Sequence, residues 1–285
     1  MTDDMQTVAE QQRQYWNSPV GERWVSNQTT LDGMFVPLTE ALIEAADIKP
    51  GEKILDVGCG AGTTTRILAA KVGNNGRVLG VDISTALLAA AKTQAGEGAL
   101  EFFEGDAGSA IVPMENADLI ISRFGVMFFA DTAQAFGHMR KVLNPGGRIC
   151  FVCWGRLQDN PWFQMPLEVI ADRLGPVEPI KPRAPGPLAF AQTDYIEEFL
   201  GKAKFGNIEI KTRDMPLICR HEPSEIAGFL MEFGPGARVL ATLDVDEETR
   251  QQLIVDMAER VTAFKEKEGV RIPASLHYVR ATNCS

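Results

Sequence analysis

A glycine-rich turn that directly follows a short apolar strand constrains this chain more than any other segment. The strand is expected at residues 53–57, and the chain continues as Gly58-Cys59-Gly60-Ala61-Gly62 before a helical pattern at 63–72. Because glycine has no Cβ, such a turn lets the backbone approach a ligand, and the following helix directs its first N–H groups at that ligand. A plain tight turn is the alternative, but three glycines at alternate positions favour a ligand site.

Strand and helix patterns alternate regularly along residues 38–155. Strands are expected at 53–57, 77–81, 100–104, 117–122 and 148–154, and helices at 63–72, 84–95 and 132–143. The fourth strand is a continuous apolar run, which is typical of a strand that is buried on both faces. The alternation predicts βαβ units, a parallel sheet and right-handed crossovers.

The pattern changes after residue 155. Residues 156–192 are rich in proline and predict a loop or lid, and a helix at 193–203, a strand at 207–214, helices at 223–233 and 246–267 and a last strand at 275–281 follow. We therefore expect three parts. These are an N-terminal helical arm or lid at 1–37, a ligand-binding core at 38–155, and the rest of the sheet at 156–285 with cap insertions at about 156–192 and 216–269.

The spacing of the glycines bears on the kind of ligand. Dinucleotide binding prefers G-x-G-x-x-G, but Thr63 stands where the last glycine of that pattern would fall. Asp56 precedes the first glycine by two residues, where a carboxylate suits a cationic ammonium better than a pyrophosphate. A nucleoside with an amino-acid tail therefore fits better than a dinucleotide. An NAD(P)-dependent Rossmann oxidoreductase is the alternative, although no catalytic Tyr/Lys or His set is found.

Two further acids follow the second and third predicted strands. Asp82 can accept hydrogen bonds from two ribose hydroxyls, or it can serve as an acid at a helix start. Asp106 can accept from an adenine amino group, or it can shape a turn. Open α/β sheets bind ligands at the carboxyl ends of their strands, so three acids at successive strand ends predict one site.

Taken together, these residues resemble a class I S-adenosylmethionine-dependent methyltransferase, of the ubiquinone/menaquinone-biosynthesis-like small-molecule branch. The resemblance covers residues 50–154, including the segments 56–62, 81–82, 105–107, 117–122 and 143–147. It implies an α/β, Rossmann-like seven-stranded mixed sheet with an antiparallel last strand, helices on both faces and a mostly helical cap. It also implies S-adenosyl-L-methionine as cofactor, S-adenosyl-L-homocysteine as product, and in-line SN2 transfer to a small-molecule acceptor.

The resemblance also assigns residues to the cofactor site. It places Asp56 and the turn residues Gly58, Cys59, Gly60 and Gly62 at the methionine moiety, Asp82 on the ribose, Ile83 against the adenine, Asp106 with Ala107 at the adenine edge, and Ser122 with Arg123 beside cofactor and acceptor. Tyr15 and Trp24 match the aromatic pair of the glycine-type small-molecule methyltransferases in type and spacing. A core-packing arm is the equal alternative for that pair.

The acceptor side is less clearly marked. Arg123 can bind an acceptor carboxylate or form an ion pair, and candidate wall residues are Phe124, Met127, Phe128, Trp154 and Trp162. Core packing is the alternative for Phe124, Met127 and Phe128, whereas Trp154 and Trp162 flank the start of the proline-rich insertion. We identify no catalytic residue and no metal-ligand set. A protein that binds the cofactor without transferring a methyl group is the other alternative function.

Composition narrows the partners. Lys and Arg total 28 against 38 Asp and Glu, giving a net charge of −10, which argues against nucleic acid. Cys150 and Cys153 lie in an apolar run, which favours buried reduced thiols over zinc. Residues 1–14 lack an apolar signal core, and no run reaches the 18 apolar residues of a membrane span. We expect a cytoplasmic protein without a membrane span, and a homodimer is one assembly that the resemblance allows.

Overall fold

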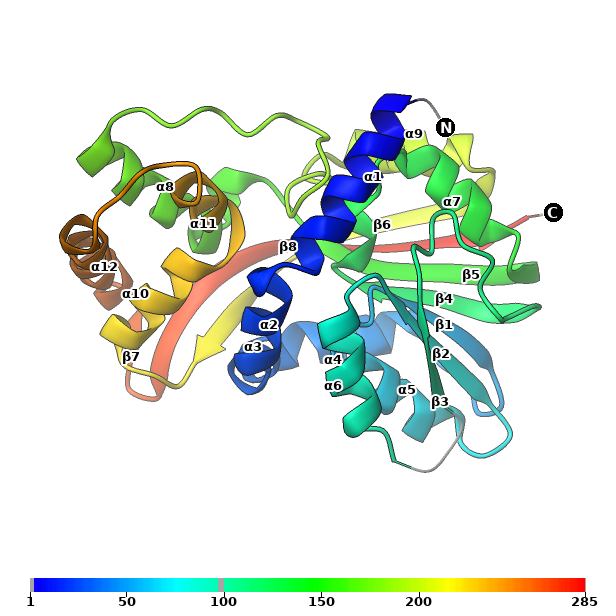
Figure 1. Ribbon diagram of the computed structural model, residues 1–285. Helices are drawn as coiled ribbons and strands as arrows, with labels where there is room; N and C mark the ends of the chain where they lie inside the picture. Colours follow the sequence, from blue (N-terminus) through cyan, green and yellow to red (C-terminus); the bar gives the residue numbers. More distant parts are fainter. Residues whose placement is uncertain (1–2, 97–99, 285) are drawn as a thin grey trace.

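A twisted sheet organises the protein in the computed structural model, which describes residues 3–96 and 100–284 (Figure 1). The main strands follow the order β3-β2-β1-β4-β5-β8-β6. They are β1 (Lys53–Val57), β2 (Arg77–Asp82), β3 (Leu100–Glu104), β4 (Ala117–Arg123), β5 (Leu143–Trp154), β6 (Phe205–Cys219) and β8 (Gly269–Asn283). Strands β1 to β5 pair in parallel, whereas β8 pairs antiparallel with both β5 and β6. The predicted mixed sheet with an antiparallel last strand is confirmed, and a short β7 (Lys265–Glu266) pairs with β8.

Helices cover the sheet. The strands in its middle are therefore buried, which explains why they are apolar runs in the sequence. The residues of β4 from Leu119 to Ser122 are all buried, as expected when both faces are covered. The covering helices are α4 (Val36–Ala46), α5 (Thr63–Val72), α6 (Thr85–Thr93), α7 (Thr132–Arg140) and α9 (Thr193–Lys202), with short 3₁₀ helices η1 (Gly125–Phe128) and η2 (Leu157–Asp159). The side chain of Ser84 accepts a hydrogen bond from the amide of Leu87, which confirms the predicted cap of α6.

The N-terminal arm consists of α1 (Asp3–Trp16), α2 (Pro19–Ser26) and α3 (Gln28–Met34). The connection between α1 and α2 is fixed to the carboxyl end of β2, because the Asn17 side-chain amide donates to the Ile83 carbonyl at 2.8 Å and accepts from the Thr85 amide at 2.9 Å. Its end is part of the core, since Met34 and Phe35 are buried. The arm therefore joins the core in its middle and at its C-terminal end, and a boundary at residue 37 stays a prediction.

The cap is mostly helical, as expected, but its first insertion differs from the prediction. Residues 156–192 were expected to form a loop or lid, but they contain α8 (Pro161–Leu174). Pro161 opens the helix, where its missing N–H has no helical partner to lose. Pro166 lies inside the helix, and burial on both sides of it, at Phe163 and Val169, outweighs the hydrogen bond that it removes. The cap also contains α10 (Pro223–Glu232), α12 (Glu247–Thr262) and the unpredicted α11 (Gly234–Leu240).

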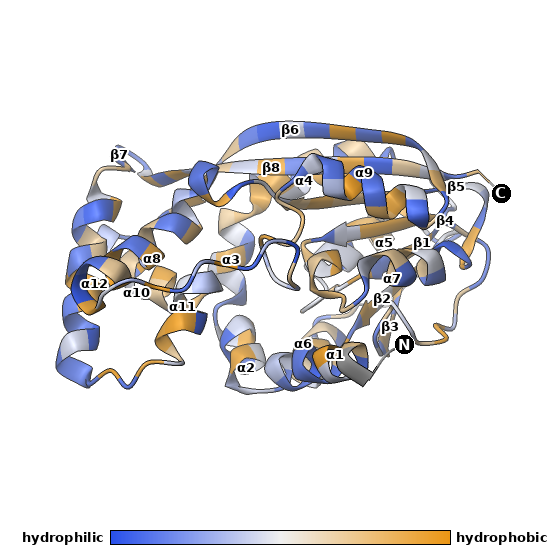
Figure 2. Ribbon diagram, turned by 90° about the horizontal axis from the view of Figure 1, so that it is seen from above, coloured by the Kyte–Doolittle hydropathy of each residue, from blue (hydrophilic) through white to orange (hydrophobic). Residues whose placement is uncertain are grey.

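A long two-stranded ribbon carries the cap. Strands β6 and β8 pair from Phe205 opposite Asn283 to Cys219 opposite Val270, whereas β5 covers only the part of β8 from Leu276 to Thr282. The far half of the ribbon therefore projects beyond the sheet to the cap helices (Figure 1). Polar and apolar residues alternate along β6 (Figure 2), as expected for an edge strand with one face exposed.

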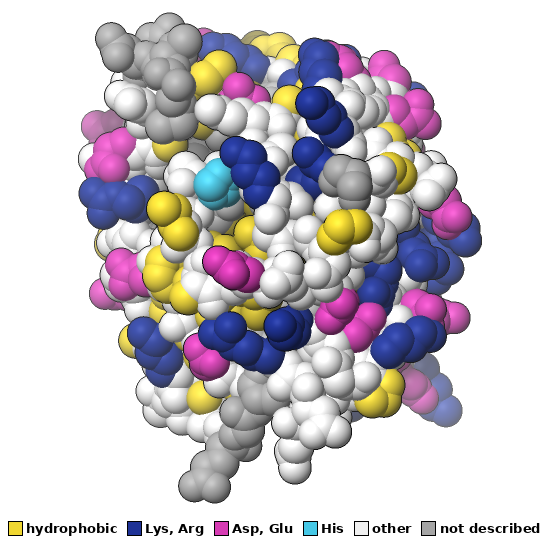
Figure 3. Space-filling view, turned by 90° about the vertical axis from the view of Figure 1, so that its right-hand side faces the viewer, with side chains coloured by type: hydrophobic (Ala, Val, Ile, Leu, Met, Phe, Trp, Pro, Cys, Tyr) yellow, Lys and Arg dark blue, Asp and Glu magenta, His cyan; other side chains and the backbone are white. Residues whose placement is uncertain are grey.

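The surface seen in Figure 3 mixes both signs of charge. Lys and Arg side chains lie among Asp and Glu side chains over this face, and neither sign forms a broad patch. Among the described helices, none combines the length and the apolar character that crossing a membrane requires.

Candidate cofactor and acceptor site

A cavity of about 490 Å³ lies at the carboxyl ends of the parallel strands, enclosed by the arm and the cap. Its volume is within the range of small-molecule sites. The structure brings most of the predicted site residues to its wall, namely Tyr15, Trp24, Gly58, Cys59, Gly60, Asp82, Ile83, Asp106, Ala107, Arg123, Phe124, Met127, Phe128, Trp154 and Trp162. Three predicted residues, Asp56, Gly62 and Ser122, are not part of this wall.

These three residues support the floor from beneath. The Asp56 carboxylate is 1% exposed and accepts a hydrogen bond from the Thr65 hydroxyl at 2.7 Å. Ser122 donates to the Val57 carbonyl at 2.7 Å and accepts from the Gly125 amide at 3.1 Å. A side chain at Gly62 would collide with the Phe102 ring, 2.8 Å from its Cβ. The expected contact between Asp56 and a ligand ammonium does not fit this buried position, because Asp56 lies under the turn.

Burial also sets the charge state of Asp56. Desolvation raises the pKa of this carboxyl to about 6, although the Thr65 hydroxyl and the Arg123 guanidinium favour the ionised form. A raised pKa in the folded state means that the folded protein holds its proton between about pH 4 and 6 while the unfolded chain has lost it. Ionisation of this carboxyl therefore lowers the free energy of unfolding above pH 6. Below pH 4 the carboxyl is protonated in both states and does not change that free energy.

Replacing Asp56 by asparagine is expected to become more favourable to stability as the pH rises. Asparagine keeps an acceptor for the Thr65 hydroxyl but carries no charge to desolvate. The free energy of unfolding of the variant, relative to the unmodified protein, should rise by up to about 3 kcal/mol between pH 4 and pH 7. Denaturant titrations at each pH measure it. A difference that stays constant over this range would mean that the Asp56 carboxyl has an ordinary pKa.

The glycine turn packs backbone against backbone on the loop that follows β4. Gly58 has φ +66°, and a Cβ placed there would lie 2.5 Å from the Gly125 Cα. Gly60 has φ +55° and no atom within 4 Å of its Cβ position. Its amide donates to the Asp82 carboxylate at 2.8 Å. The turn is thus held from both sides, with open space at Gly60 toward the cavity.

Asp82 is positioned to accept two more hydrogen bonds. One oxygen accepts from the Gly60 amide and the other from the Ser84 amide at 2.9 Å. Burial raises the pKa of Asp82, and these backbone N–H groups act against that shift. Each carboxylate oxygen can accept a second donor. The side chain is half-buried in the cavity wall, so the two oxygens suit the vicinal hydroxyls of a ribose.

The end of β3 offers acceptors of a different kind. Asp106 accepts from the Gly108 amide at 2.8 Å and from the Ser109 hydroxyl at 3.1 Å, so it shapes the turn and also lines the cavity. Gln12 of α1 lines the same cavity, and its buried Oε1 has no hydrogen-bond partner among the described residues. An unpartnered acceptor is expected where a ligand donates a hydrogen bond. The polar pattern of α1 gave no signal that singles out Gln12.

Aromatic rings form the wall on the side of β4 and β5. Phe124 has φ +70° and stacks on Trp154 with 4.6 Å between ring centroids and 7° between planes. Phe35 and Phe163 pack edge-on against Trp154 at 6.3 and 4.8 Å. A left-handed backbone at a residue other than glycine stores strain, which is common at ligand sites. The sequence indicated Phe124 and Trp154, whereas Phe35, between α3 and α4, and Phe163 of α8 are distant in sequence and were missed.

The arm closes the cavity with further rings. Trp16 packs edge-on against Trp24 at 5.8 Å and against Phe128 at 5.2 Å, and the Arg238 guanidinium of α11 lies 4.3 Å from the centre of the Tyr15 ring. The arm therefore touches both the floor and the cap. Cofactor contact by Tyr15 and Trp24 stays a prediction, and Trp16 between them was missed.

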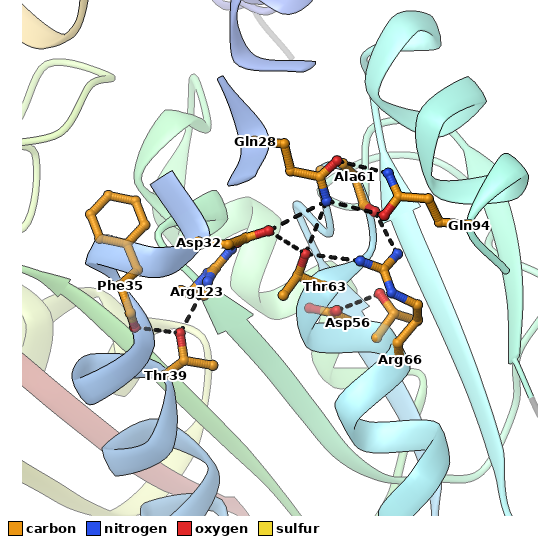
Figure 4. A network of polar contacts seen from close by, with 12 residues as sticks. Gln28, Asp32, Phe35, Thr39, Asp56, Ala61, Thr63, Arg66, Gln94 and Arg123 are labelled. Atoms are coloured by element: carbon orange, nitrogen blue, oxygen red, sulfur yellow. Dashed lines mark hydrogen bonds and ion pairs between the residues drawn. The ribbon is translucent and has the colours of Figure 1, made fainter. Parts of the chain in front are cut away.

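A polar network joins the arm to the glycine turn (Figure 4). Asp32 of α3 forms an ion pair with Arg123 at 2.9 Å, and it accepts from the Thr63 hydroxyl at 2.6 Å. Arg123 also donates to Thr39 at 3.0 Å. Gln28 donates to Thr63 at 3.1 Å. The sequence did not indicate Gln28 or Asp32, and it left Arg123 between ligand contact and ion pair.

Among the described residues, the cavity holds no activated thiol and the side chains form no metal site. Cys59 lines the cavity, but burial and the neighbouring Asp82 carboxylate raise the pKa of its thiol, which therefore stays protonated. The structure holds no group of three or more His, Cys, Asp or Glu side chains arranged for a metal ion within residues 3–96 and 100–284.

The sheet order, the glycine turn and the acids at the ends of β2 and β3 define the class I methyltransferase fold. Residues 54–147 match the family described as "Methyltransferase domain". This part of the chain is thus similar to that family, and the resemblance seen in the sequence is confirmed.

Curated relatives match stretches of the chain of similar length. The aklanonic acid methyltransferase DauC of Streptomyces sp. (strain C5) is 32% identical over 120 residues, which cover 41% of this chain and 54% of the relative. The demethylmenaquinone methyltransferase of Bacillus mycoides (strain KBAB4) is 37% identical over 106 residues, covering 36% of this chain and 45% of the relative. The chain therefore spans about half the length of these relatives.

Solved structures show the same fold at low sequence identity. The YcgJ protein from Bacillus subtilis superimposes with a TM-score of 0.56 at 17% identity, over 87% of this chain and 98% of that chain. A Haemonchus contortus phosphoethanolamine N-methyltransferase 2 in complex with S-adenosyl-L-methionine gives a TM-score of 0.55 at 18% identity, over 92% of this chain and 57% of that chain. These likenesses concern the fold alone.

Proposed function

We propose that this protein transfers a methyl group from S-adenosyl-L-methionine to a small-molecule acceptor and releases S-adenosyl-L-homocysteine. The observation that carries the proposal is Asp82, held by the amides of Gly60 and Ser84 with both oxygens available to the vicinal hydroxyls of a ribose. The methyltransferase domain at residues 54–147 supports the same reading.

A nicotinamide dinucleotide fits this site less well. The acid at the end of β2 suits the ribose of either ligand, so it does not separate the two functions. The third glycine of the dinucleotide pattern is Thr63, whose hydroxyl is occupied by Asp32 at 2.6 Å. Neither observation favours a Rossmann oxidoreductase.

The chain contributes mainly binding and positioning to the proposed reaction. The bound cofactor supplies a methyl group that its sulfonium has already activated for displacement. Asp82 fixes the ribose, and the rings of the arm favour a nearby cation through their negative faces. The arm and the cap exclude water from the reacting atoms. Holding donor and acceptor in line accounts for most of the expected rate enhancement.

The aromatic wall supports an acceptor with a flat apolar part. Phe124, Trp154 and Phe163 face the cavity from three different segments. Two relatives are named for aklanonic acid and demethylmenaquinone, and we extend only the chemistry of an apolar small molecule to this chain. The acceptor atom and a general base are not assigned.

We also propose a cytoplasmic location and no nucleic-acid partner. All five cysteines, which lie within the described residues, are free thiols. The net charge of −10 opposes binding to phosphate backbones. A homodimer stays a prediction that size-exclusion chromatography with light scattering measures.

Calorimetric titration tests the proposed function. S-adenosylhomocysteine is expected to bind at one site per chain, while NAD and NADP give no heat of binding. Tight binding of a nicotinamide nucleotide would end the methyltransferase proposal. Binding of S-adenosylhomocysteine without methyl transfer from labelled S-adenosylmethionine to any of a panel of phenols, enols and quinols would favour the protein that binds without catalysis.

A further inference from the structure

The strand order determines where the amino-acid tail of the cofactor must lie. Adenine at the end of β3 and ribose at the end of β2 leave the tail to continue over the β1 turn toward β4, the next strands in the order β3-β2-β1-β4. Two strand spacings separate β2 from β4, about 10 Å. Arg123 is the last residue of β4 and lines the cavity there.

Few charged side chains remain to bind the tail. Apart from the acids at the ends of β2 and β3, the described cavity wall carries five charged residues. Glu10 and Arg13 pair with each other on α1 at 2.7 Å, and Arg238 covers the Tyr15 ring. Asp32 and Arg123 are left, and they lie next to the glycine turn (Figure 4).

The Asp32–Arg123 pair has the charges of an amino-acid zwitterion in reverse. The two side chains are only 23% and 18% exposed, and their mutual distance is 2.9 Å. Arg123 donates one hydrogen bond to Asp32 and one to Thr39. A guanidinium has five N–H donors, so donors remain for a ligand. Because the pair and the zwitterion are each neutral, neither the free nor the bound state leaves a charge without compensation in the wall.

From this geometry we propose that Asp32 binds the α-ammonium and Arg123 the α-carboxylate of the cofactor's amino-acid tail. The assignment rests on the proposed function and replaces Asp56, which lies beneath the turn, as the partner of the ammonium. The acceptor then meets the aromatic wall rather than Arg123.

Thr63 fixes Asp32 in place before the ligand arrives. Its hydroxyl donates to Asp32 at 2.6 Å and accepts from the Arg66 guanidinium at 3.0 Å, and the Gln28 amide lies within 3.3 Å of Asp32 and 3.1 Å of Thr63. The residue that breaks the dinucleotide glycine pattern therefore orients the carboxylate. A preorganised carboxylate loses little side-chain entropy on binding.

A comparison of ligands with and without the tail tests this assignment. S-adenosylhomocysteine carries the whole tail, decarboxylated S-adenosylmethionine carries only the amine, and 5′-methylthioadenosine carries neither group. Asp32→Asn is expected to weaken binding of the first two by about 10- to 100-fold and to leave methylthioadenosine within about 2-fold. Arg123→Met is expected to weaken S-adenosylhomocysteine by a similar factor and to change decarboxylated S-adenosylmethionine little.

Asp106→Asn serves as the matched control, because an adenine contact affects all three ligands alike. Equal losses for all three ligands in Asp32→Asn would assign Asp32 a structural role and overturn the proposal. If a variant does not fold, the unmodified protein decides, since equal affinity for S-adenosylhomocysteine and methylthioadenosine excludes any tail subsite. Absence of binding of every adenosyl ligand would instead refute the proposed function.

Discussion

Replacing Asp82 by alanine is expected to weaken S-adenosylhomocysteine binding by roughly 100-fold or more, measured by calorimetric titration. The variant loses two hydroxyl donors to a carboxylate, each contributing about 1.5–3 kcal/mol. Both oxygens already accept backbone amides, one from Gly60 and one from Ser84, so the carboxylate is held in place at this edge of the cavity. An unchanged dissociation constant would leave Asp82 only its role at the start of α6.

Two comparisons separate the ribose contact from damage to the turn. The 2′-deoxy analogue of S-adenosylhomocysteine should bind the unmodified protein more weakly, and Asp82→Ala should no longer distinguish the two ligands. Asp118→Ala is the matched control. Asp118 also accepts a backbone amide, that of Lys53 at 2.9 Å, but it does not line the cavity. Its removal should leave S-adenosylhomocysteine affinity unchanged.

Gly58→Ala is expected to cost about 2–5 kcal/mol of stability, since it combines a left-handed backbone with a clash in a packed interior. The new Cβ would lie 2.5 Å from the Gly125 Cα, where only backbone movement gives relief. At roughly 2–4 °C per kcal/mol, the melting temperature should fall by about 5–15 °C. Thermal unfolding followed by circular dichroism measures it.

Two other glycines isolate the two contributions. Gly60→Ala keeps the positive φ without any neighbour within 4 Å, so it should show the backbone cost alone, about 1–2 kcal/mol. Gly125→Ala meets the Gly58 Cα at 2.6 Å and has no positive φ, so it should show the clash alone. Equal melting temperatures for Gly58→Ala and Gly60→Ala would contradict close packing of the two loops.

The parallel core was predictable because its signals are local. Each strand of the core is a short apolar run, and Ser84 marks the start of a helix in the sequence itself. The cap was less predictable, because Pro166 lies inside a helix that tertiary burial stabilises. The short α11 begins with Gly234 and Pro235, which have weak local helix propensity, so the sequence pattern did not predict this helix.

The site was predictable where residues follow strand ends, as Asp82 and Asp106 do. Asp56 shows the limit of that argument. It is the second-last residue of β1, and its side chain lies under the loop that follows the strand. Asp32 was missed because its partner Arg123 is 91 residues away, a contact that only the tertiary fold creates. Phe35, which is buried and lies against Phe124, was missed for the same reason.

The second cap insertion leaves and rejoins the sheet at a single rung of the β6–β8 ladder, where Cys219 lies opposite Val270. Residues 220–268 therefore form one excursion from this hairpin, and a substitute of another length would leave the rungs between β6 and β8 in register. The free energy of closing such a loop changes only slowly with its length. The methyltransferase-domain match ends at residue 147, well before this excursion. The architecture thus allows the part of the cavity wall that Phe233 and α11 supply to be exchanged as a unit without altering the floor formed at the ends of the parallel strands.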